Sequence, residues 1–217
     1  MQADQWQERW RNGRIGFHSS TVARPLTRFW STLNLPPGST VFAPLCGKSL
    51  DLLWLRDQQN SVVGVELSEI AIEAFFIENG IAARRVEGAL HSEYRAKGLR
   101  LLCGDLFNAT PQILHGCTAV YDRAALVALP PKLQIEYALK IAALTSCGTQ
   151  TLLITLEYPQ HEMRGPPYSV DCDVVDRLYS AHHKIEILDR ADILTSDPLR
   201  ARGITQLQEV CYRLTRR

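Results

Sequence analysis

The sequence lacks an excess of either charge: 24 Lys and Arg residues stand against 23 Asp and Glu residues, a formal net charge of +1. A protein that holds nucleic acid through phosphate charge usually carries a basic excess, so that class is disfavoured, although a local basic patch stays open. No apolar run approaches the roughly 18 residues that a membrane span needs. The first ten residues are polar and mixed in charge, unlike a signal peptide. We therefore expect a soluble, cytoplasmic protein with no nucleic-acid or membrane partner.

Cysteine motifs and metal motifs are also missing. The six cysteines are scattered, and none pairs with another at CxxC spacing. Cysteines in apolar stretches are typical of a reducing cytoplasm, where they act as small hydrophobic residues. The histidines form no HExxH set, and no GxSxG elbow for a catalytic serine occurs. The sequence therefore predicts neither a metal site nor a serine hydrolase.

Glycine is missing where phosphate-binding loops need it. Residues 44–49 read PLCGKS, like the end of a P-loop, but Phe42 stands where the first glycine belongs. Gly47 is the only glycine in this turn, so the GxGxxG fingerprint of dinucleotide-binding proteins is absent as well. The turn can still face a ligand that is less crowded than a pyrophosphate, or it is an ordinary connection.

Strand-like and helix-like segments alternate along a chain whose length suits one domain with additions. This alternation predicts an α/β fold with a mostly parallel sheet and helices on both faces. Expected strands cover residues 39–45, 61–66, 99–103, 118–121, 149–156, 185–188 and 207–214. Expected helices cover residues 4–11, 22–34, 49–59, 68–79, 130–148 and 171–180. Residues 81–98 show no clear pattern.

Ligands of such sheets bind beyond the carboxyl ends of the strands, so the residues at those ends matter most. Glu66 ends the second expected strand, about twenty residues after the first turn, where a carboxylate can accept hydrogen bonds from both hydroxyls of a ribose. The alternative is a solvated carboxylate at the start of the helix that Ser68 caps, and position alone does not decide between them. With no pyrophosphate loop, a ribose site indicates a nucleoside ligand such as S-adenosylmethionine.

Two further strand ends carry polar residues. Asp105 and Leu106 can meet an adenine, the first accepting from its amine and the second covering its face; alternatively Asp105 starts a turn, as Asp often does. Arg123 follows Asp122 and offers a planar fork of donors to a carboxylate or an electron-rich substrate, unless it is an ordinary surface arginine.

Aromatic residues gather near the amino terminus. Trp6, Trp10 and Phe17 can attract a sulfonium through their ring faces or close over a site as a lid. Core packing is the favoured interpretation of Trp6, whereas Trp10, beside a glycine-containing loop, is the better lid residue.

Five ordered motifs resemble those of bacterial thiopurine S-methyltransferases over nearly the whole chain. They are W-x-x-x-W-x-x-G from Trp6 running on to Phe17-His18, PLCGKS at 44–49, VVGVELSE at 62–69, DRAALVALP at 122–130 and GPPYSV at 165–170. The resemblance implies a class I methyltransferase fold, a seven-stranded sheet whose last strand is antiparallel. It implies S-adenosylmethionine as the methyl donor and a small-molecule substrate.

The resemblance also implies roles for individual residues. The implied cofactor contacts are Trp10, Leu45, Glu66, Asp105, Leu106 and Arg123. Arg123 is in addition the expected catalytic residue, and Phe17 the residue that approaches the substrate. The region of Arg200 and Arg202 matches the family less cleanly, so a substrate role there is weakly supported. We expect a single monomeric domain over 1–217 with a helical lid at about 1–35.

Several alternatives stay open at this point. One is a nicotinamide-dependent oxidoreductase on a doubly wound sheet, and another is a non-catalytic module that binds a nucleoside. Thiopurines are synthetic, so the natural acceptor is a different compound; small thiols and oxidised selenium or tellurium species, in a detoxifying role, are the expected candidates.

Overall fold

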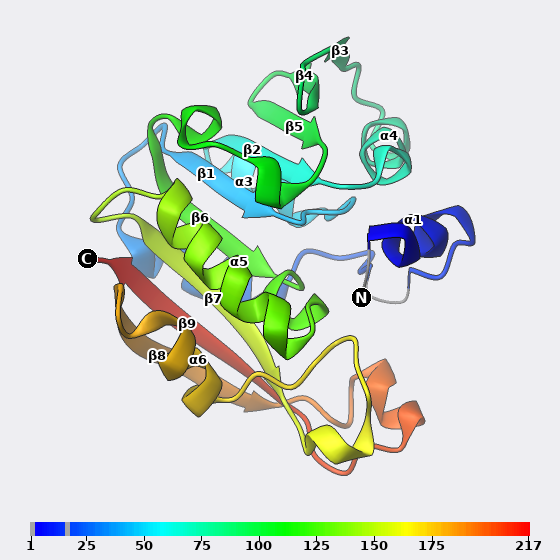
Figure 1. Ribbon diagram of the computed structural model, residues 1–217, viewed down its shortest axis with the longest axis vertical. Coiled ribbons are helices and arrows are strands. Elements are labelled where there is room, and N and C mark those ends of the chain that lie inside the picture. Colours follow the sequence, from blue (N-terminus) through cyan, green and yellow to red (C-terminus); the bar gives the residue numbers. More distant parts are fainter. Residues whose placement is uncertain (1–2, 16–17) are drawn as a thin grey trace. The chain divides into compact units, whose positions relative to one another are not determined.

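The computed structural model describes residues 3–15 and 18–217, and these form two compact units, Met1–Tyr121 and Asp122–Arg217 (Figure 1). The helices of the first unit are α1 (Ala3–Arg11), α2 (Arg24–Phe29), α3 (Asp51–Asp57) and α4 (Glu69–Glu78), with 3₁₀ turns η1 (Trp30–Leu33), η2 (Leu106–Asn108) and η3 (Pro111–Leu114). Its strands are β1 (Thr40–Pro44), β2 (Ser61–Glu66), β3 (Arg84–Val86), β4 (Ser92–Ala96) and β5 (Leu99–Cys103), and β6 (Cys117–Arg123) continues into the second unit.

The strands of the first unit lie in the order β3-β4-β5-β2-β1-β6. β5, β2, β1 and β6 run parallel, whereas β3 and β4 are antiparallel to their neighbours. Five of the six residues of β2 are buried, as expected for a parallel strand that is covered on both faces. The carboxyl ends of β1, β2 and β5 therefore share one edge of this sheet.

A glycine lets the turn after β1 pack closely against β2. A Cβ atom at Gly64, in the middle of β2, would lie 2.7 Å from both Cys46 Sγ and Leu101 Cδ2. The main chain reinforces this contact, because Cys46 N–H donates to the carbonyl oxygen of Val65 at 3.2 Å. The position of the PLCGKS turn thus depends on the absence of a side chain one strand away.

The helix expected over residues 22–34 is interrupted. α2 ends at Phe29, the chain continues as the 3₁₀ turn η1, and Asn34 then takes the left-handed conformation with φ of 50°. The buried carboxylate of Asp51 accepts hydrogen bonds from Ala23 N–H and the Tyr121 hydroxyl, both at 2.8 Å. Asp51 thereby attaches the start of α2 to α3 and β6.

The described residues contain nine strands, not the seven expected. The two additions, β3 and β4, lie in the segment 81–98 that gave no pattern. β3 has only three residues, none of them buried, so hydrophobic alternation could not reveal it. Ionic side chains support the pair: Arg85 contacts Glu69 at 3.0 Å, and Glu69 also accepts from the Tyr94 hydroxyl at 2.5 Å.

The second unit contains η4 (Leu126–Ala128), α5 (Pro131–Leu144), β7 (Gln150–Glu157), η5 (Gln160–Glu162), α6 (Cys172–Tyr179), β8 (His183–Asp192), η6 (Pro198–Arg202) and β9 (Gln208–Arg216). Its strand order is β7-β9-β8, and β9 is antiparallel to both neighbours, which confirms the expected antiparallel last strand. β8 is longer than the expected 185–188 and contains an irregularity between Ile187 and Asp189.

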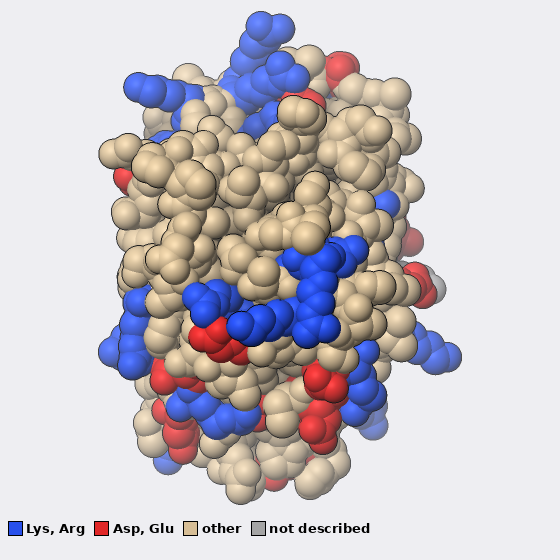
Figure 2. Space-filling model, turned by 90° about the vertical axis from the view of Figure 1, so that its left-hand side faces the viewer, with Lys and Arg blue, Asp and Glu red and all other residues tan. Residues whose placement is uncertain are grey.

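The surface carries both signs of charge. On the face drawn in Figure 2, acidic and basic side chains lie next to one another in the lower half, below a broad uncharged area. Among the described residues, no helix is both long and apolar enough to cross a membrane.

Candidate functional site

Glu66 lies where β2 ends and connects two turns. Its Oε2 atom accepts a hydrogen bond from Gly47 N–H in the turn after β1, and its Oε1 atom accepts one from Ser68 N–H before α4, both at 2.9 Å. Its side chain is 7% exposed, so the alternative of a solvated carboxylate is wrong. Burial raises the pKa of Glu66, and the main-chain donors around it oppose this shift. A carboxylate has about four lone-pair sites, so the main-chain donors leave room for a hydroxyl of a ligand.

Ser68 takes the N-cap position of α4, as expected, but its hydroxyl does not cap the helix. Glu66 instead accepts the N–H of Ser68 itself. The Ser68 hydroxyl oxygen is buried and has no hydrogen-bond partner in the described part of the chain. The cap prediction is therefore correct in position and wrong in mechanism, because a buried carboxylate already organises this turn.

Trp10 packs over the turn after β1. Gly47 has φ of +53°, and a Cβ atom there would lie 3.3 Å from Cζ2 of the Trp10 ring. Trp10 is 7% exposed, whereas Trp6 is only partly buried and has the Arg9 guanidinium 5.4 Å from its ring centroid. The structure thus brings Trp10, Gly47 and Glu66 together, although the sequence separates them by up to 56 positions (66 minus 10).

Leu45, directly after β1, has an unusual backbone conformation. Its φ of +47° is left-handed, which is uncommon for a residue with a branched side chain and costs on the order of 1–3 kcal/mol. Ala124, directly after β6, has φ of 60°. Strained residues cluster at functional sites, so these two turns fit the strand-end positions that the sequence singled out.

Asp105 and Leu106 follow β5 and are attached to the Glu66 turn, because Gly104 N–H donates to the Glu66 carbonyl oxygen at 2.9 Å. Asp105 is exposed, and its Oδ1 atom accepts from Phe107 N–H at 2.9 Å, so it does start a turn. Leu106 is 1% exposed and packs into the core. The adenine contact of both residues stays a prediction.

Arg123 and Arg202 belong to the second unit. Arg123 is the last residue of β6 and is partly buried. Phe17 lies outside the described residues. Arg202, in η6, donates through Nη1 to the Pro166 carbonyl oxygen at 3.3 Å, which connects it to the GPPYSV segment and gives it a structural contact.

The neighbour of Arg123 is held firmly. Asp122 is 2% exposed; its Oδ2 atom accepts from the Tyr137 hydroxyl at 2.7 Å, and its Oδ1 atom accepts from Leu126 N–H at 3.2 Å. Asp122 therefore attaches the end of β6 to α5 and η4. Burial raises the pKa of Asp122 from 3.8 to about 6, although both hydrogen bonds oppose the shift.

This raised pKa predicts a pH-dependent stability. The folded chain holds the Asp122 proton more tightly than the unfolded chain does. The protonated carboxyl therefore contributes to the unfolding free energy fully below about pH 4, and this contribution is lost as the pH rises through about 6. A shift of about two units corresponds to roughly 3 kcal/mol. Asp122→Asn has a neutral side chain of the same shape, so its stability should not follow this titration. We expect the unfolding free energy of the wild type to fall relative to that of Asp122→Asn as the pH rises from 4 to 7. Urea unfolding at four pH values measures this, and a constant difference between the two proteins would contradict it.

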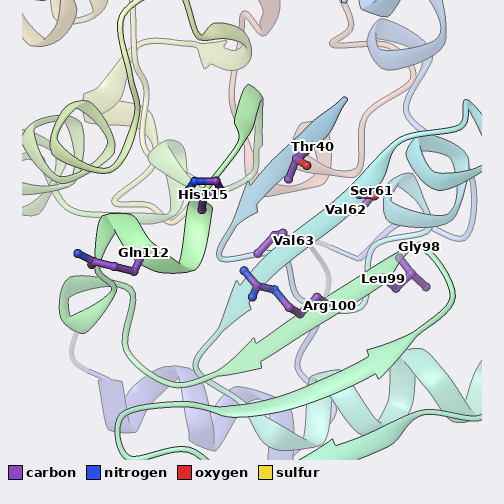
Figure 3. Close-up of a pocket in the computed structure, with 9 residues that line it drawn as sticks. All are labelled: Thr40, Ser61, Val62, Val63, Gly98, Leu99, Arg100, Gln112 and His115. Atoms are coloured by element: carbon purple, nitrogen blue, oxygen red, sulfur yellow. The ribbon is translucent and has the colours of Figure 1, made fainter. Parts of the chain in front are cut away.

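A pocket of about 340 Å³ lies at the opposite edge of the first unit, where β1, β2 and β5 begin (Figure 3). Its lining includes Thr40, Ser61 and Leu99, the first residues of these strands, with Arg100 and His115 beside them. None of the predicted site residues in the described part of the chain lines it. The pocket is therefore a surface hollow away from the carboxyl ends of the strands, where the predicted site residues of the first unit lie.

Sequence reasoning missed the residues that support the site through distant contacts. Asp51 and Tyr121 lie 70 positions apart, and His91 lies in the segment without a pattern. His91 is 8% exposed, and its Nε2 atom lies 3.0 Å from the Asp105 carbonyl oxygen. No local signal in the sequence could have indicated these pairs.

The geometry suits a nucleoside: a buried carboxylate at the end of β2, a glycine turn, a tryptophan over that turn and an exposed carboxylate in the turn after β5. A family model described as Thiopurine S-methyltransferase matches residues 1–217. The chain belongs to the thiopurine S-methyltransferase family. Two relatives named thiopurine S-methyltransferase support this: one from Bordetella petrii is 46% identical over 100% of this chain and 99% of its own length, and one from Xanthomonas axonopodis pv. citri is 44% identical over 100% of both.

Solved structures agree on the fold of this family member. A SAM-dependent methyltransferase from Anabaena variabilis superimposes with a TM-score of 0.67 at 15% identity, covering 99% of this chain and 95% of its own. A Burkholderia thailandensis 1,6-didemethyltoxoflavin N1-methyltransferase, solved with S-adenosylhomocysteine, gives 0.64 at 15% identity, covering 98% and 87%. The expected class I methyltransferase fold is thereby confirmed, with the two added strands β3 and β4.

Proposed function

We propose that this protein transfers the methyl group of S-adenosylmethionine to the sulfur of thiopurines and related small thiols. The observation that carries the proposal is the buried Glu66 carboxylate, which two main-chain N–H groups hold at the end of β2. Membership of the thiopurine S-methyltransferase family supports the reaction class. Relatives of that name match the chain over its whole length.

The chain's own residues divide the binding of the donor between them. Glu66 accepts hydrogen bonds from the ribose hydroxyls, and Gly47 leaves room for the Trp10 ring over the turn. Asp105, exposed at the end of β5, accepts from the adenine amine, with Leu106 beside it. Trp10 covers the turn and excludes water from the sulfonium, whose charge its ring face attracts.

When bound, the donor supplies an activated methyl group whose bond to sulfur breaks as the acceptor sulfur attacks, leaving S-adenosylhomocysteine, while the acceptor's proton passes to solvent. The protein's task is to align the two sulfurs and keep water out. Arg123 binds the electron-rich acceptor through its guanidinium, and Phe17 approaches the acceptor's ring. A thiopurine sulfur is easily deprotonated, so no strong general base is required.

A methyl-transfer assay tests the proposal. Radiolabelled S-adenosylmethionine is incubated with the full chain and either a thiopurine or an aromatic alcohol of similar size. We expect label on the thiopurine alone. Label on the alcohol would overturn the sulfur preference, and binding of S-adenosylhomocysteine without transfer to thiopurines, thiols, selenium or tellurium species would indicate a non-catalytic module. Preference for NAD over S-adenosylhomocysteine would revive the oxidoreductase alternative.

We also place the protein in the cytoplasm. All six cysteines are free thiols, and two of them, Cys147 and Cys172, are exposed, which suits a reducing compartment. The expected monomer stays a prediction that light scattering checks.

A further inference from the structure

His91 occupies a distinctive place beneath the turn that follows β5. It is 8% exposed, although it belongs to an otherwise exposed loop between β3 and β4. Its Nε2 atom lies 3.0 Å from the carbonyl oxygen of Asp105. A carbonyl oxygen only accepts hydrogen bonds, so Nε2 donates here.

Gly104 makes this contact possible. A Cβ atom at Gly104 would lie 2.5 Å from Cδ2 of the His91 ring and 2.9 Å from the Leu90 carbonyl oxygen. The imidazole therefore lies flush against the main chain of the turn. On its other side Gly104 N–H donates to the Glu66 carbonyl oxygen at 2.9 Å. The turn is held between His91 and the end of β2.

The hydrogen bond restrains the one residue of this turn that offers an exposed carboxylate. Asp105 Oδ1 accepts from Phe107 N–H at 2.9 Å, which sets the direction of the side chain relative to its own main chain. With the main-chain carbonyl held by His91, the carboxylate has both its position and its direction determined. A restrained acceptor loses less conformational freedom when a donor arrives.

We infer that His91 is a positioning residue for nucleoside recognition: it holds the Asp105 turn so that the carboxylate meets the exocyclic amine of adenine. This inference rests on the proposed function, because it uses the contact between Asp105 and the adenine. His91 itself does not touch the ligand. Its effect is on the choice of base, and not on the ribose, which Glu66 binds.

The test compares two ligands that differ only at the position that Asp105 reads. S-Adenosylhomocysteine carries the amine, and its analogue with an unsubstituted purine base has a hydrogen atom in its place. We expect the wild type to bind the adenosyl compound at least about tenfold more tightly, as for a charged hydrogen bond that is lost. His91→Ala should weaken adenosyl binding about tenfold and reduce the discrimination to about threefold or less. His91→Gln, whose Nε2 atom can donate from a similar position, should restore most of it.

Two matched variants separate positioning from general stability. His115→Ala alters an exposed histidine at the opposite edge of the same sheet (Figure 3) and should leave both affinities unchanged. His183→Ala alters a histidine that is 2% exposed in the second unit, so it should lower the melting temperature without changing the discrimination ratio. His115→Ala thus shows the effect of removing a histidine far from the turn, and His183→Ala shows the effect of lost stability alone.

The outcomes are distinguishable. A His91→Ala protein that folds, binds more weakly and keeps the wild-type ratio would overturn the role of His91 and leave the function standing. Equal wild-type affinity for the two ligands would overturn the Asp105 contact and the inference built on it. A wild type that binds neither ligand would overturn the proposed function itself.

Discussion

Glu66→Ala is expected to weaken S-adenosylhomocysteine binding by about 1–3 kcal/mol, roughly 5- to 150-fold, because a charged acceptor for the ribose hydroxyls is lost. It is also expected to destabilise the protein, because the N–H groups of Gly47 and Ser68 lose their acceptors at 2.9 Å in a buried place. Each unsatisfied group costs about 1–3 kcal/mol. Calorimetric titration and urea unfolding measure the two effects separately.

Two variants control this experiment. Glu66→Gln keeps the size but has one carbonyl oxygen for two N–H donors, so it should fall between alanine and the wild type in both measurements. Glu69→Ala removes a partly exposed carboxylate three residues later, whose partners are Arg85 and Tyr94, and should leave ligand binding unchanged. An unchanged dissociation constant in Glu66→Ala would remove Glu66 from the site.

Arg123→Ala is expected to lower kcat/KM for a thiopurine by roughly 10- to 150-fold, because a charge-assisted hydrogen bond to the acceptor is worth about 1.5–3 kcal/mol. Arg123→Lys keeps the charge without the planar fork and should recover only part of the rate. The strand end should stay in place, because Asp122 holds it through Tyr137 and Leu126. Steady-state kinetics at saturating S-adenosylmethionine measure the effect.

The matching control is Arg200→Ala, in η6, where a substrate role is weakly supported. We expect it to retain wild-type kinetics. If Arg123→Ala left both the affinity for the acceptor and the turnover unchanged, the catalytic role of Arg123 would be wrong.

Much of the fold was predictable from the sequence because buried parallel strands leave a strong local pattern. The β-branched run of β2 was located to the residue, and β5 likewise, since both are apolar and bounded by polar turns. β3 and β4 escaped because β3 has no buried residue and β4 has only one, Tyr94; Arg85 pairs with Glu69 and Tyr94, and such polar pairs have no periodicity. The break between α2 and η1 escaped as well, because the apolar spacing of Leu26, Trp30 and Leu33 suits either kind of helix.

For the candidate site too, some features were predictable from the sequence and others were not. Patterns in the sequence placed Glu66 and Arg123 at strand ends and Asp105 shortly after a strand, excluded a pyrophosphate loop and matched the motifs of a methyltransferase family. The folded chain was needed to see that Glu66 is buried and bound to Gly47, that Trp10 packs on that turn and that His91 holds the main chain of Asp105. The two kinds of information differ in how far apart the interacting residues lie in the sequence. Strand ends follow from local hydrophobic patterning, whereas burial and hydrogen-bond partners depend on residues that folding brings together.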